Sequence, residues 1–514
     1  MKQWISYFSQ KIFQTGTGEF NSAIYAPYNI IGWLNLYDFA TDREVKQMAR
    51  AVLDYYACEM ALHYSQAMTG GSDLRGKRCT ESFKGAAAYL GWLWFGDSPQ
   101  PLDKSNLNQG DDCNNALIQP VHAATSTYRV PGIAAKLAKG KLTNPAMYYN
   151  SKPGYLLEKP SSIKQTFYRT DKYSMGAGYF PYGGWSAGDH QIVSWKLISR
   201  VAKGKNKTAQ YVSGIGMENP AGKHYCHGNQ RSPFDQLVHH RNVLIQMTRV
   251  PENSKRIEAT IQKIYNDWQS KWERDFYKRF PNDTDRGMPV HFQYLDVSVN
   301  RSSLIFRDAG HLVSDLRQNI LFIELEKTWL AIRSLRKDRP FDLKFSEDEE
   351  YRYAGVKASR GTVCGLIVEV SARDEYPNMQ AFQEAIIQKT QLDNEQLDSH
   401  NTITYLGLKG DTITCRYNVS GSFYEPLFDW GYGPTEPMMI HTSPPFKQPK
   451  WPEGIGHGKI ASWWVNGEKV LTNKPWPVYD GPGLFIGKGR LELTAGEKIY
   501  EIDYTGDLPV FNNH

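Results

Sequence analysis

Apolar positions in the first half of the chain recur at the spacing of an α-helix. Over Val45–Tyr64 they return every three or four residues and form one stripe about five turns long. Thr41 and Glu44 stand just before this stripe in a capping-box arrangement, in which each side chain satisfies a backbone N–H of the other residue. Ile30–Phe39 also predicts a helix. Because the connection between the two helices is so short, we expect them to be antiparallel neighbours.

Three more helices are predicted in this half, at Ala86–Phe95, Ala116–Thr125 and Gln191–Val201. Long segments rich in Gly, Asn, Tyr and Pro separate the helices, notably 97–115, 143–189 and 213–235. Loops of this length are uncommon inside a compact domain unless they build a binding surface. Helical hairpins with long aromatic loops at one end predict a toroid, or an incomplete barrel, of hairpins.

Near residue 285 the pattern changes to short β-branched or aromatic runs, separated by turn signals such as Lys409-Gly410-Asp411 and Asn466-Gly467. The expected strands are Val290–Val299, Ser303–Arg307, Ile320–Leu325, Trp329–Arg333, Thr362–Val370, Thr402–Leu408, Thr412–Asn418, Ile460–Val465 and Glu492–Tyr504. Such a succession predicts an antiparallel β-sandwich. A charged helix over 254–280 would connect the halves or form a flap. We therefore predict an α+β multidomain protein, with an (α/α) toroid over 1–285 and an antiparallel β-sandwich over 286–514.

Composition narrows the function classes. The 514 residues are too many for one ordinary core, and 40% hydrophobic with 22% charged residues describes a globular chain, which excludes a long disordered or fibrous protein. The 60 Lys and Arg against 54 Asp and Glu give a net charge of +6 that is scattered along the chain. This distribution argues against nucleic-acid binding and is compatible with an acidic polymer as substrate.

Other features of the sequence restrict location and redox chemistry. No apolar run approaches about 18 residues, so we expect no membrane-spanning helix. The N-terminal segment lacks the apolar core of a signal peptide. The six Cys are far apart without a CxxC pair, which favours buried thiols over a disulfide scaffold. Aromatic residues make up 13% of the chain, and their faces can stack on sugar rings.

The segment Phe20–Gly96 carries a resemblance to a known family. It contains Asn21-Ser22-Ala23-Ile24-Tyr25, the Gly-rich loop Gly70–Arg78 and the motif Gly91–Gly96, and the second half adds Gly365–Val370. In order and pattern these segments resemble the heparinase II/III-like polysaccharide lyases, in which an (α/α) toroid precedes a β-sandwich. Relatives usually carry additional N-terminal helices, so one or two hairpins of a full toroid are expected to be missing. Relatives are also usually periplasmic or secreted.

The resemblance implies β-elimination on a uronic-acid polysaccharide of the alginate, glycosaminoglycan or ulvan type. The C5 proton of a uronate is very weakly acidic until Asn, Arg, His or a metal neutralises the carboxylate. A Tyr or His base must then remove this proton, and an acid, often Tyr, protonates the leaving glycosidic oxygen. The predicted partner is therefore an acidic polysaccharide, with neither nucleic acid nor membrane and with the oligomeric state left open.

Three residues are the predicted catalytic groups. Asn21 and Tyr25 stand four apart at a helix entrance, where Asn would neutralise the uronate and Tyr would transfer a proton. The alternative is that Asn21-Ser22 cap the helix while Tyr25 packs. His190 follows Asp189 at the expected start of a helix, where the cationic form of His is disfavoured, which suits a neutral base. A structural histidine paired with Asp189 is the alternative.

The predicted substrate-binding residues provide charge and aromatic surface. Arg75 and Arg78 flank Gly76 and offer planar donors that match a carboxylate or sulfate; a solvated turn is the alternative. Tyr182, Trp185, His224 and Arg231 complete the predicted binding set. Two further Tyr-Arg pairs in expected loops have the right chemistry, Tyr128-Arg129 and Tyr168-Arg169.

No metal or other cofactor is predicted, although a metal stays open as an alternative at the cluster of His224, Cys226 and His227, whose spacing matches no standard zinc motif. His63, near the end of the long helix, is expected to favour the helix C-terminus electrostatically. Two other functions stay open. A glycoside hydrolase would need two carboxylates facing one cleft, from the loop-rich set Asp73, Glu81, Asp111, Asp112 and Asp189. A non-catalytic glycan-binding protein would lack a competent base.

Overall fold

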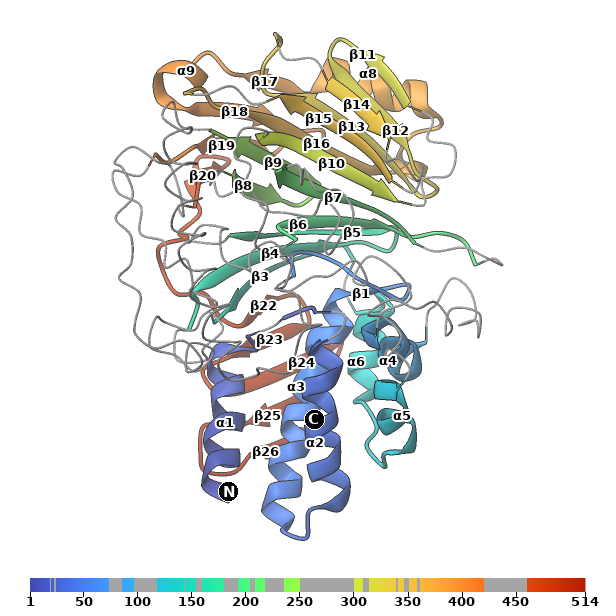
Figure 1. Ribbon diagram of the computed structural model, residues 1–514, viewed down its shortest axis with the longest axis vertical. Coiled ribbons are helices and arrows are strands. Elements are labelled where there is room, and N and C mark those ends of the chain that lie inside the picture. The colour runs from blue at the N-terminus through green and yellow to red at the C-terminus, as the bar shows by residue number, and fades with distance from the viewer. Residues whose placement is uncertain are drawn as a thin grey trace, which may run out of the picture.

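The computed structural model describes residues 1–18, 20–22, 25–73, 86–96, 118–142, 144–153, 160–179, 193–203, 209–217, 235–249, 300–307, 314–338, 341–345, 351–357, 361–419 and 460–513. This part of the chain is mixed α+β, with a group of helices at its N-terminal end and several antiparallel sheets (Figure 1). The predicted combination of N-terminal helices with antiparallel sheets is confirmed at this level. The described helices do not close into a toroid.

The N-terminal helices are α1 (Lys2–Thr15), α2 (Tyr25–Phe39), α3 (Arg43–His63), α4 (Ala86–Phe95), α5 (Ile118–Thr125) and α6 (Gly132–Ala138). Later in the chain come the short helices η7 (Arg373–Glu375), α8 (Met379–Lys389) and α9 (Leu397–His400). Apolar periodicity predicted α2, α3, α4 and α5, whereas α1, α6 and α8 were missed.

The start of α3 differs by one residue from the prediction. Asp42, not Thr41, is the N-cap, and its side chain accepts hydrogen bonds from the backbone N–H groups of Glu44 and Val45. A carboxylate at this position also interacts favourably with the helix dipole, and Lys2 pairs with it at 2.9 Å. From Ala51 to Glu59 every residue of α3 is buried, because helices and strands surround this part of the helix.

Most strands belong to two large antiparallel sheets. The 13-stranded sheet has the order β14-β15-β10-β7-β6-β5-β4-β3-β22-β23-β24-β25-β26, and the 6-stranded sheet has the order β11-β12-β13-β16-β9-β8. A 5-stranded sheet (β17-β18-β19-β20-β21) and the hairpin β1-β2 complete the set among the described residues. The strand bounds are β1 Tyr64–Ser65, β2 Met68–Thr69, β3 Ala146–Lys152, β4 Ile163–Arg169, β5 Tyr173–Tyr179, β6 Trp195–Ser199, β7 Gln210–Met217, β8 Asp235–His240, β9 Val243–Thr248, β10 Asn300–Arg307, β11 Ser314–Arg317, β12 Ile320–Glu324, β13 Thr328–Ser334, β14 Phe341–Phe345, β15 Tyr351–Lys357, β16 Cys364–Ala372, β17 Gln391–Asp393, β18 Thr402–Leu406, β19 Thr412–Arg416, β20 Ser462–Val465, β21 Glu468–Lys469, β22 Tyr479–Gly481, β23 Leu484–Gly487, β24 Arg490–Ala495, β25 Lys498–Asp503 and β26 Val510–Asn513.

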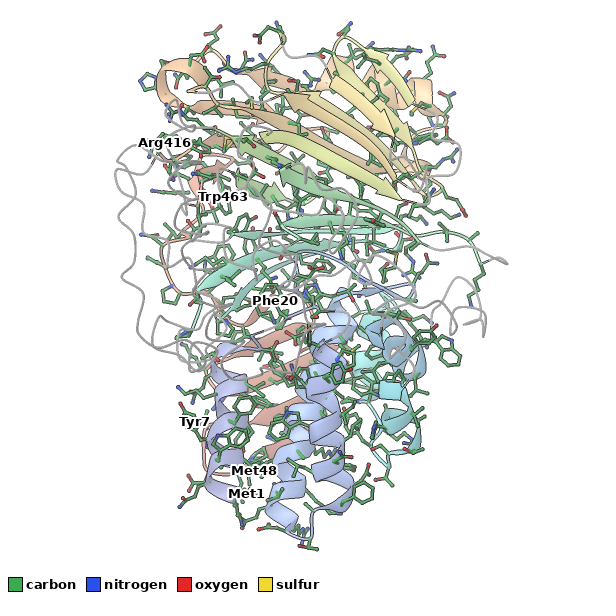
Figure 2. All side chains as sticks on the ribbon, in the orientation of Figure 1. Met1, Tyr7, Phe20, Met48, Arg416 and Trp463 are labelled. Atoms are coloured by element: carbon green, nitrogen blue, oxygen red, sulfur yellow. The ribbon has the colours of Figure 1, made fainter. Side chains whose placement is uncertain are left out.

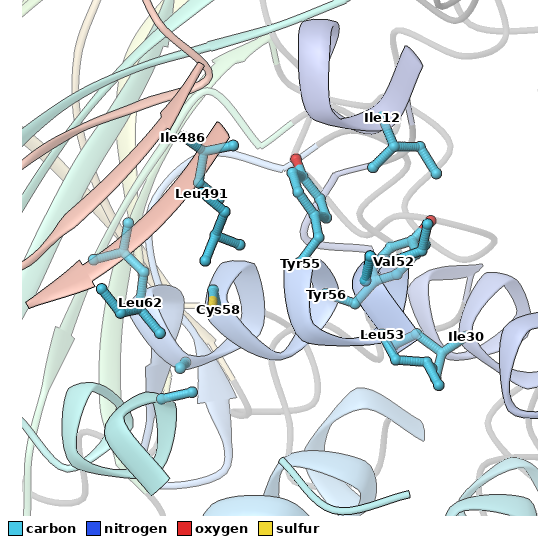
Figure 3. Packing of buried hydrophobic residues seen from close by; sticks show 14 of the residues in the cluster. Ile12, Ile30, Val52, Leu53, Tyr55, Tyr56, Cys58, Leu62, Ile486 and Leu491 are labelled. Carbon is cyan, nitrogen blue, oxygen red and sulfur yellow. The ribbon is translucent and has the colours of Figure 1, made fainter. Parts of the chain in front are cut away.

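Two cores hold these elements together. In the first, α1 and α3 pack on the C-terminal strands β23–β25, so that the two ends of the chain share one core (Figure 1). The view in Figure 3 shows Cys58 and Leu62 of α3 beside Ile486 and Leu491 of these strands. The second core lies between the central part of the 13-stranded sheet and the strands β8, β9, β13 and β16.

The structure corrects the position at which strands begin. Strands β3–β9 occupy 146–248, where no strand was predicted: β3–β5 lie in the predicted loop 143–189, and β6 lies inside the predicted helix Gln191–Val201. The reason is that β4, β5 and β6 are buried at every position and therefore lack the alternation of a half-buried strand. The predicted domain boundary at 285/286, the helix over 254–280 and the strand Val290–Val299 lie outside the described residues.

The later strand predictions are largely confirmed. Strands β10, β12, β13, β16, β18, β19 and β20 overlap their predicted ranges. The predicted strand Glu492–Tyr504 is instead a hairpin of β24 and β25, with Ala495 opposite Lys498 at its turn. Asn466-Gly467 forms the predicted turn between β20 and β21.

Candidate functional site

The candidate site lies where the N-terminal helices meet the 13-stranded sheet, at the segment Thr69–Asp73 that begins with the last residue of β2. This segment crosses the sheet at very close range. A Cβ on Gly176 of β5 would lie 2.8 Å from the carbonyl oxygen of Thr166 and 3.0 Å from the Cα of Gly71. Gly70 is equally restricted, since its Cβ would lie 2.8 Å from the Oγ of Ser174. The glycines of the predicted loop motif therefore allow the backbone to lie directly on the strands.

Three hydrogen bonds fix the end of this segment. The side-chain amide Nδ2 of Asn21 donates to the Ser72 carbonyl oxygen at 3.0 Å, and Gln165 Nε2 donates to Ser72 Oγ at 2.7 Å. The backbone N–H of Asp73 donates to the Val193 carbonyl oxygen at 3.1 Å, in an isolated antiparallel β-bridge. Asn21 thus lies beside the point at which Asp73 and Val193 pair.

The Asp73–Val193 bridge joins the ends of two segments that carry predicted site residues. In the sequence, Asp73 immediately precedes the segment that carries Arg75 and Arg78. Val193 immediately follows the segment that carries Tyr182, Trp185 and His190. The end of one segment and the beginning of the other are therefore hydrogen-bonded to each other next to Asn21.

Beneath the bridge lies a fully buried ion pair. Lys196 Nζ is 3.2 Å from Asp73 Oδ2, and both side chains are 0% exposed. Lys196 also donates to the Thr69 carbonyl oxygen at 2.9 Å, which ties the other end of the segment to β6. Burial raises the pKa of Asp73, and the nearby Lys196 ammonium opposes this rise. Because two buried charges cost several kcal/mol in desolvation, each depends on the other.

A second buried ion pair lies on the helix side of the same region. Lys152 at the end of β3 pairs with Glu59 of α3 and donates to the Tyr479 hydroxyl at 2.5 Å. Thr17 and Tyr479 donate to the Glu59 carboxylate at 3.0 and 2.9 Å. Burial lowers the pKa of Lys152, whereas Glu59 raises it. Phe20, labelled in Figure 2 where the helices meet the sheet, lies 5.9 Å from Lys152 Nζ by its ring centroid.

His63 lies between the two ion pairs as a neutral imidazole. Its Nδ1 is 3.1 Å from the Gly70 carbonyl oxygen, which can only accept, so Nδ1 carries the hydrogen and Nε2 the lone pair. Burial, followed by the positive charge of Lys152, lowers the pKa of His63 to about 3. The buried Nε2 has no hydrogen-bond partner within the described part of the chain.

The expectation that a cationic His63 favours the C-terminus of α3 is wrong, because the imidazole is buried and uncharged. Arg169 takes this role, since its Nη1 donates to the carbonyl oxygens of Ala61 and Leu62 at 2.9 Å. Arg169 lies at the end of β4 and is buried, so the prediction that Tyr168-Arg169 lies in a loop is also wrong. Tyr128 likewise is buried and donates to Asp54 at 2.7 Å.

Of the predicted catalytic residues, Asn21 and Tyr25 lie in the described part of the chain. Asn21 is 7% exposed and has a left-handed backbone with φ of 55°. The Ser22 hydroxyl accepts from the backbone N–H of Tyr25 at 3.1 Å, so Ser22 provides the side-chain cap of α2. Tyr25 is half-buried in the first turn of α2, with its ring centroid 6.3 Å from that of Tyr28.

The remaining predicted site residues lie outside the described residues: Arg75, Arg78, Tyr182, Trp185, His190, His224 and Arg231. The same holds for the predicted metal alternative at Cys226 and His227. Of the carboxylates considered for glycoside hydrolysis, Asp73 is described, and it is buried against Lys196. His239, in β8, is buried, and Thr166 Oγ1 lies 2.8 Å from its Nδ1.

Sequence reasoning missed four of the charged and phenolic groups at this site, namely Glu59, Lys152, Lys196 and Tyr479. A signal was present on α3, where Tyr55, Glu59 and His63 recur at steps of four and share one face of a helix that is otherwise apolar. Lys152 and Lys196 gave no such signal, since a single Lys in an unrecognised strand carries no periodic context.

The described residues contain neither a cluster of metal ligands nor a membrane-spanning helix. No group of three or more His, Cys, Asp or Glu side chains there is arranged to hold a metal ion. None of the described helices combines the length and the apolar character needed to cross a bilayer. Comparisons of the chain with models of protein families, with curated proteins and with solved structures gave no match.

Proposed function

We propose that this chain is a polysaccharide lyase that cleaves a uronic-acid-containing acidic polysaccharide by β-elimination. The observation that carries the proposal is the Asp73–Val193 bridge beside Asn21. It links the two sequence segments that bear the Arg and His candidates, and it does so next to the Asn candidate.

In the proposed mechanism Asn21, Arg75 and Arg78 neutralise the uronate carboxylate, which makes the C5 proton acidic enough to remove. His190 or Tyr25 acts as the base, and a Tyr protonates the leaving oxygen. Tyr182, Trp185, His224 and Arg231 bind neighbouring sugars. The hydrogen bond from Asn21 to Ser72 supports this assignment. It fixes the orientation of the Asn21 amide, with one N–H group directed to the segment that leads to Arg75.

The two buried ion pairs support the proposal as a rigid base for the cleft. Lys196–Asp73 anchors the beginning of one candidate segment, and Lys152–Glu59 fixes the strand and helix beside it. A catalytic arrangement loses rate when its groups move by about an ångström, so loops that carry catalytic residues need a fixed attachment.

We also infer that the helices α1–α6 belong to an incomplete (α/α) toroid. The support is that α2 and α3 form a hairpin, while α3 also packs against α1 and α6. In a toroid of this kind the cleft would open at the end of the hairpins that faces the β-sheets, which is the end at which α3 reaches His63.

A panel assay tests the proposed reaction class. The chain is incubated with alginate, glycosaminoglycans and ulvan while ultraviolet absorbance and reducing ends are measured. Elimination leaves a C4–C5 double bond conjugated to the uronate carboxylate, so a lyase raises both signals together. Reducing ends without absorbance would assign a glycoside hydrolase, and retention on a polysaccharide gel without either signal would assign a binding protein. Either result overturns the proposal.

A further inference from the structure

A cleft of about 390 Å³ opens on the helical end of the molecule, away from the candidate site. Four parts of the chain form it: α3, the segment from Arg129 into α6, and the C-terminal strands β25 and β26. Its volume is within the range of about 300–1,000 Å³ that is usual for small-molecule sites. Pro131 and Ile133 contribute an apolar wall.

Cationic side chains dominate the lining. Arg50, Arg129, Lys136 and Lys498 all line the cleft, against the single carboxyl group of Asp54. Lys498 is two residues from Tyr500 on β25, so both point to the cleft side of the strand. The acidic residues Glu501 and Asp503 alternate with them and pair elsewhere, Glu501 with Asn512 Nδ2 at 3.4 Å and Asp503 with Arg490 Nη2 at 3.1 Å.

Asp54 does little to neutralise these cations, because it is 1% exposed and already bonded. The hydroxyls of Tyr128 and Tyr500 donate to its two oxygens at 2.7 and 2.5 Å. Arg50 Nε is 3.8 Å from Asp54 Oδ2, and the Arg50 guanidinium also stacks 4.5 Å from the Phe511 ring centroid. Within the described chain, Lys136 and Lys498 have no acidic partner within 4.0 Å.

We propose that this cleft binds a small organic anion, about as large as one sugar ring, whose carboxylate is held by Lys136, Lys498 and Arg129. The apolar wall and the Tyr500 ring edge would contact the body of the ligand. Four cations around one cavity repel one another, and an anionic ligand relieves this repulsion.

This cleft is separate from the proposed lyase site, because the two lie against different faces of α3. Arg50 and Asp54 share one face of the helix, whereas Tyr55, Glu59 and His63 share the neighbouring face that points to the 13-stranded sheet. Asp54 and His63 are nine residues apart, about 13 Å along the helix. Binding here therefore does not depend on whether the chain cleaves polysaccharide.

Isothermal titration calorimetry of the full chain with glucuronate tests the proposal, with glucose as the neutral analogue and the ionic strength held constant. Glucuronate is expected to bind in this cleft, as a component separate from any binding at the proposed lyase site, and glucose is expected to give no heat. The double variant Lys136→Gln/Lys498→Gln should weaken glucuronate binding by about 10-fold or more, since it removes two cations that contact the carboxylate. Both side chains are exposed, so circular dichroism should show an unchanged fold.

Lys139→Gln is the matched control, because Lys139 is an exposed lysine at the C-cap of α6 that does not line the cleft. This variant should bind glucuronate as the unaltered chain does. The proposal is overturned if glucuronate gives no heat, if Lys139→Gln weakens binding as much as the double variant, or if inorganic phosphate binds while glucuronate does not.

Discussion

Buried lysines are the residues on which the candidate site depends most strongly. Lys152 and Lys196 are both fully buried, each against one carboxylate, so neither ammonium group is exposed to bulk solvent. Removing one partner of such a pair leaves a charge that the interior cannot solvate, whereas an exposed pair loses little. The stability of the site is therefore decided by single side chains.

Lys196→Met is expected to lower the free energy of unfolding by about 3–5 kcal/mol, because Asp73 is then buried without its partner. Urea unfolding measures this change. Lys172→Met is the control, since Lys172 is partly exposed in its pair with Asp171 and should cost no more than about 1 kcal/mol. If the two substitutions lower the free energy of unfolding equally, the buried Lys196–Asp73 pair contributes no more to stability than an exposed pair does.

The contribution of Asp54 to the free energy of unfolding should depend on pH. Burial raises the pKa of this carboxyl to about 6, above its ordinary value of 3.8, although Tyr500, Tyr128 and Arg50 oppose the rise. The folded chain therefore holds a proton that the unfolded chain has lost, and Asp54 costs stability as the pH rises from about 4 through 6. Relative to Asp54→Asn, the unaltered chain should lose up to about 3 kcal/mol between pH 4 and pH 7.

Urea unfolding of both proteins across this pH range measures the difference. A constant gap between Asp54→Asn and the unaltered chain would show that the carboxyl titrates at the same pH in the folded and unfolded states. That result would contradict the buried, phenol-bonded position of Asp54 at the cationic cleft.

Among the elements, α3 contributes side chains both to the candidate site and to the cleft lined by Arg50 and Asp54. One of its faces bears Tyr55, Glu59 and His63 toward the candidate site, and the next bears Arg50 and Asp54 toward the cationic cleft. Apolar periodicity was sufficient to predict this helix, because a long amphipathic stripe is visible in sequence. The polar residues within it were not interpreted as buried, since burial on all sides depends on strands that come hundreds of residues later.

The strands β4–β6 show why other elements could not be predicted. Their residues are buried on both faces, so the period-2 signal is absent, and Gly, Ser and Tyr in Tyr173–Tyr179 suggested a loop instead. Gly176 was not recognised as a contact point because its function is to allow Gly71 to approach. The Gly70–Asp73 motif was identified from sequence, but its partner strand was not.

Gly176→Ala is expected to push the Thr69–Asp73 segment away from β5, because the new Cβ would lie within 3.0 Å of two backbone atoms. Overpacking of this kind costs about 1–3 kcal/mol, and the unfolding midpoint in urea should fall accordingly. Gly32→Ala is the matched substitution, since a Cβ at Gly32 in α2 has nothing within 4 Å. It should leave stability unchanged or raise it by up to about 1 kcal/mol. Equal losses in both variants would contradict the close approach at Gly176.

At the scale of the whole molecule, the two ends of the chain form one core. Residues from α1 and α3 pack with β23–β25, so the N-terminal helices and the C-terminal strands stabilise each other (Figure 3). The predicted division at residue 285 assigned these elements to different domains. Sequence order could not reveal their contact, because strand pairing between β3 and β22 joins residues more than 300 positions apart.

Acid should destabilise the molecule through its buried imidazoles. Burial lowers the pKa of both His63 and His239 from 6.5 to about 3, so the unfolded chain binds protons that the folded chain excludes. Each His then removes about 1.4 kcal/mol of stability per pH unit as the pH falls below 6.5. His63→Gln should reduce this slope by one such increment in urea unfolding measured between pH 6 and pH 4. An unchanged slope would mean that His63 is accessible to protons in the folded state.

We propose that Asn21 and the segments joined by the Asp73–Val193 bridge form a cleft that ionises the C5–H bond of a uronate. The most direct measurement is the rate at which ultraviolet absorbance rises when the chain acts on a uronate polysaccharide, compared with the rates of His190→Ala and Tyr25→Phe and with His400→Ala as control. His400 is exposed on α9. The unaltered chain and His400→Ala are expected to generate the unsaturated product at equal rates, while His190→Ala or Tyr25→Phe, whichever removes the base, is slower by about 100-fold or more. No absorbance from the unaltered chain, or equal rates for all four proteins, would contradict this proposal.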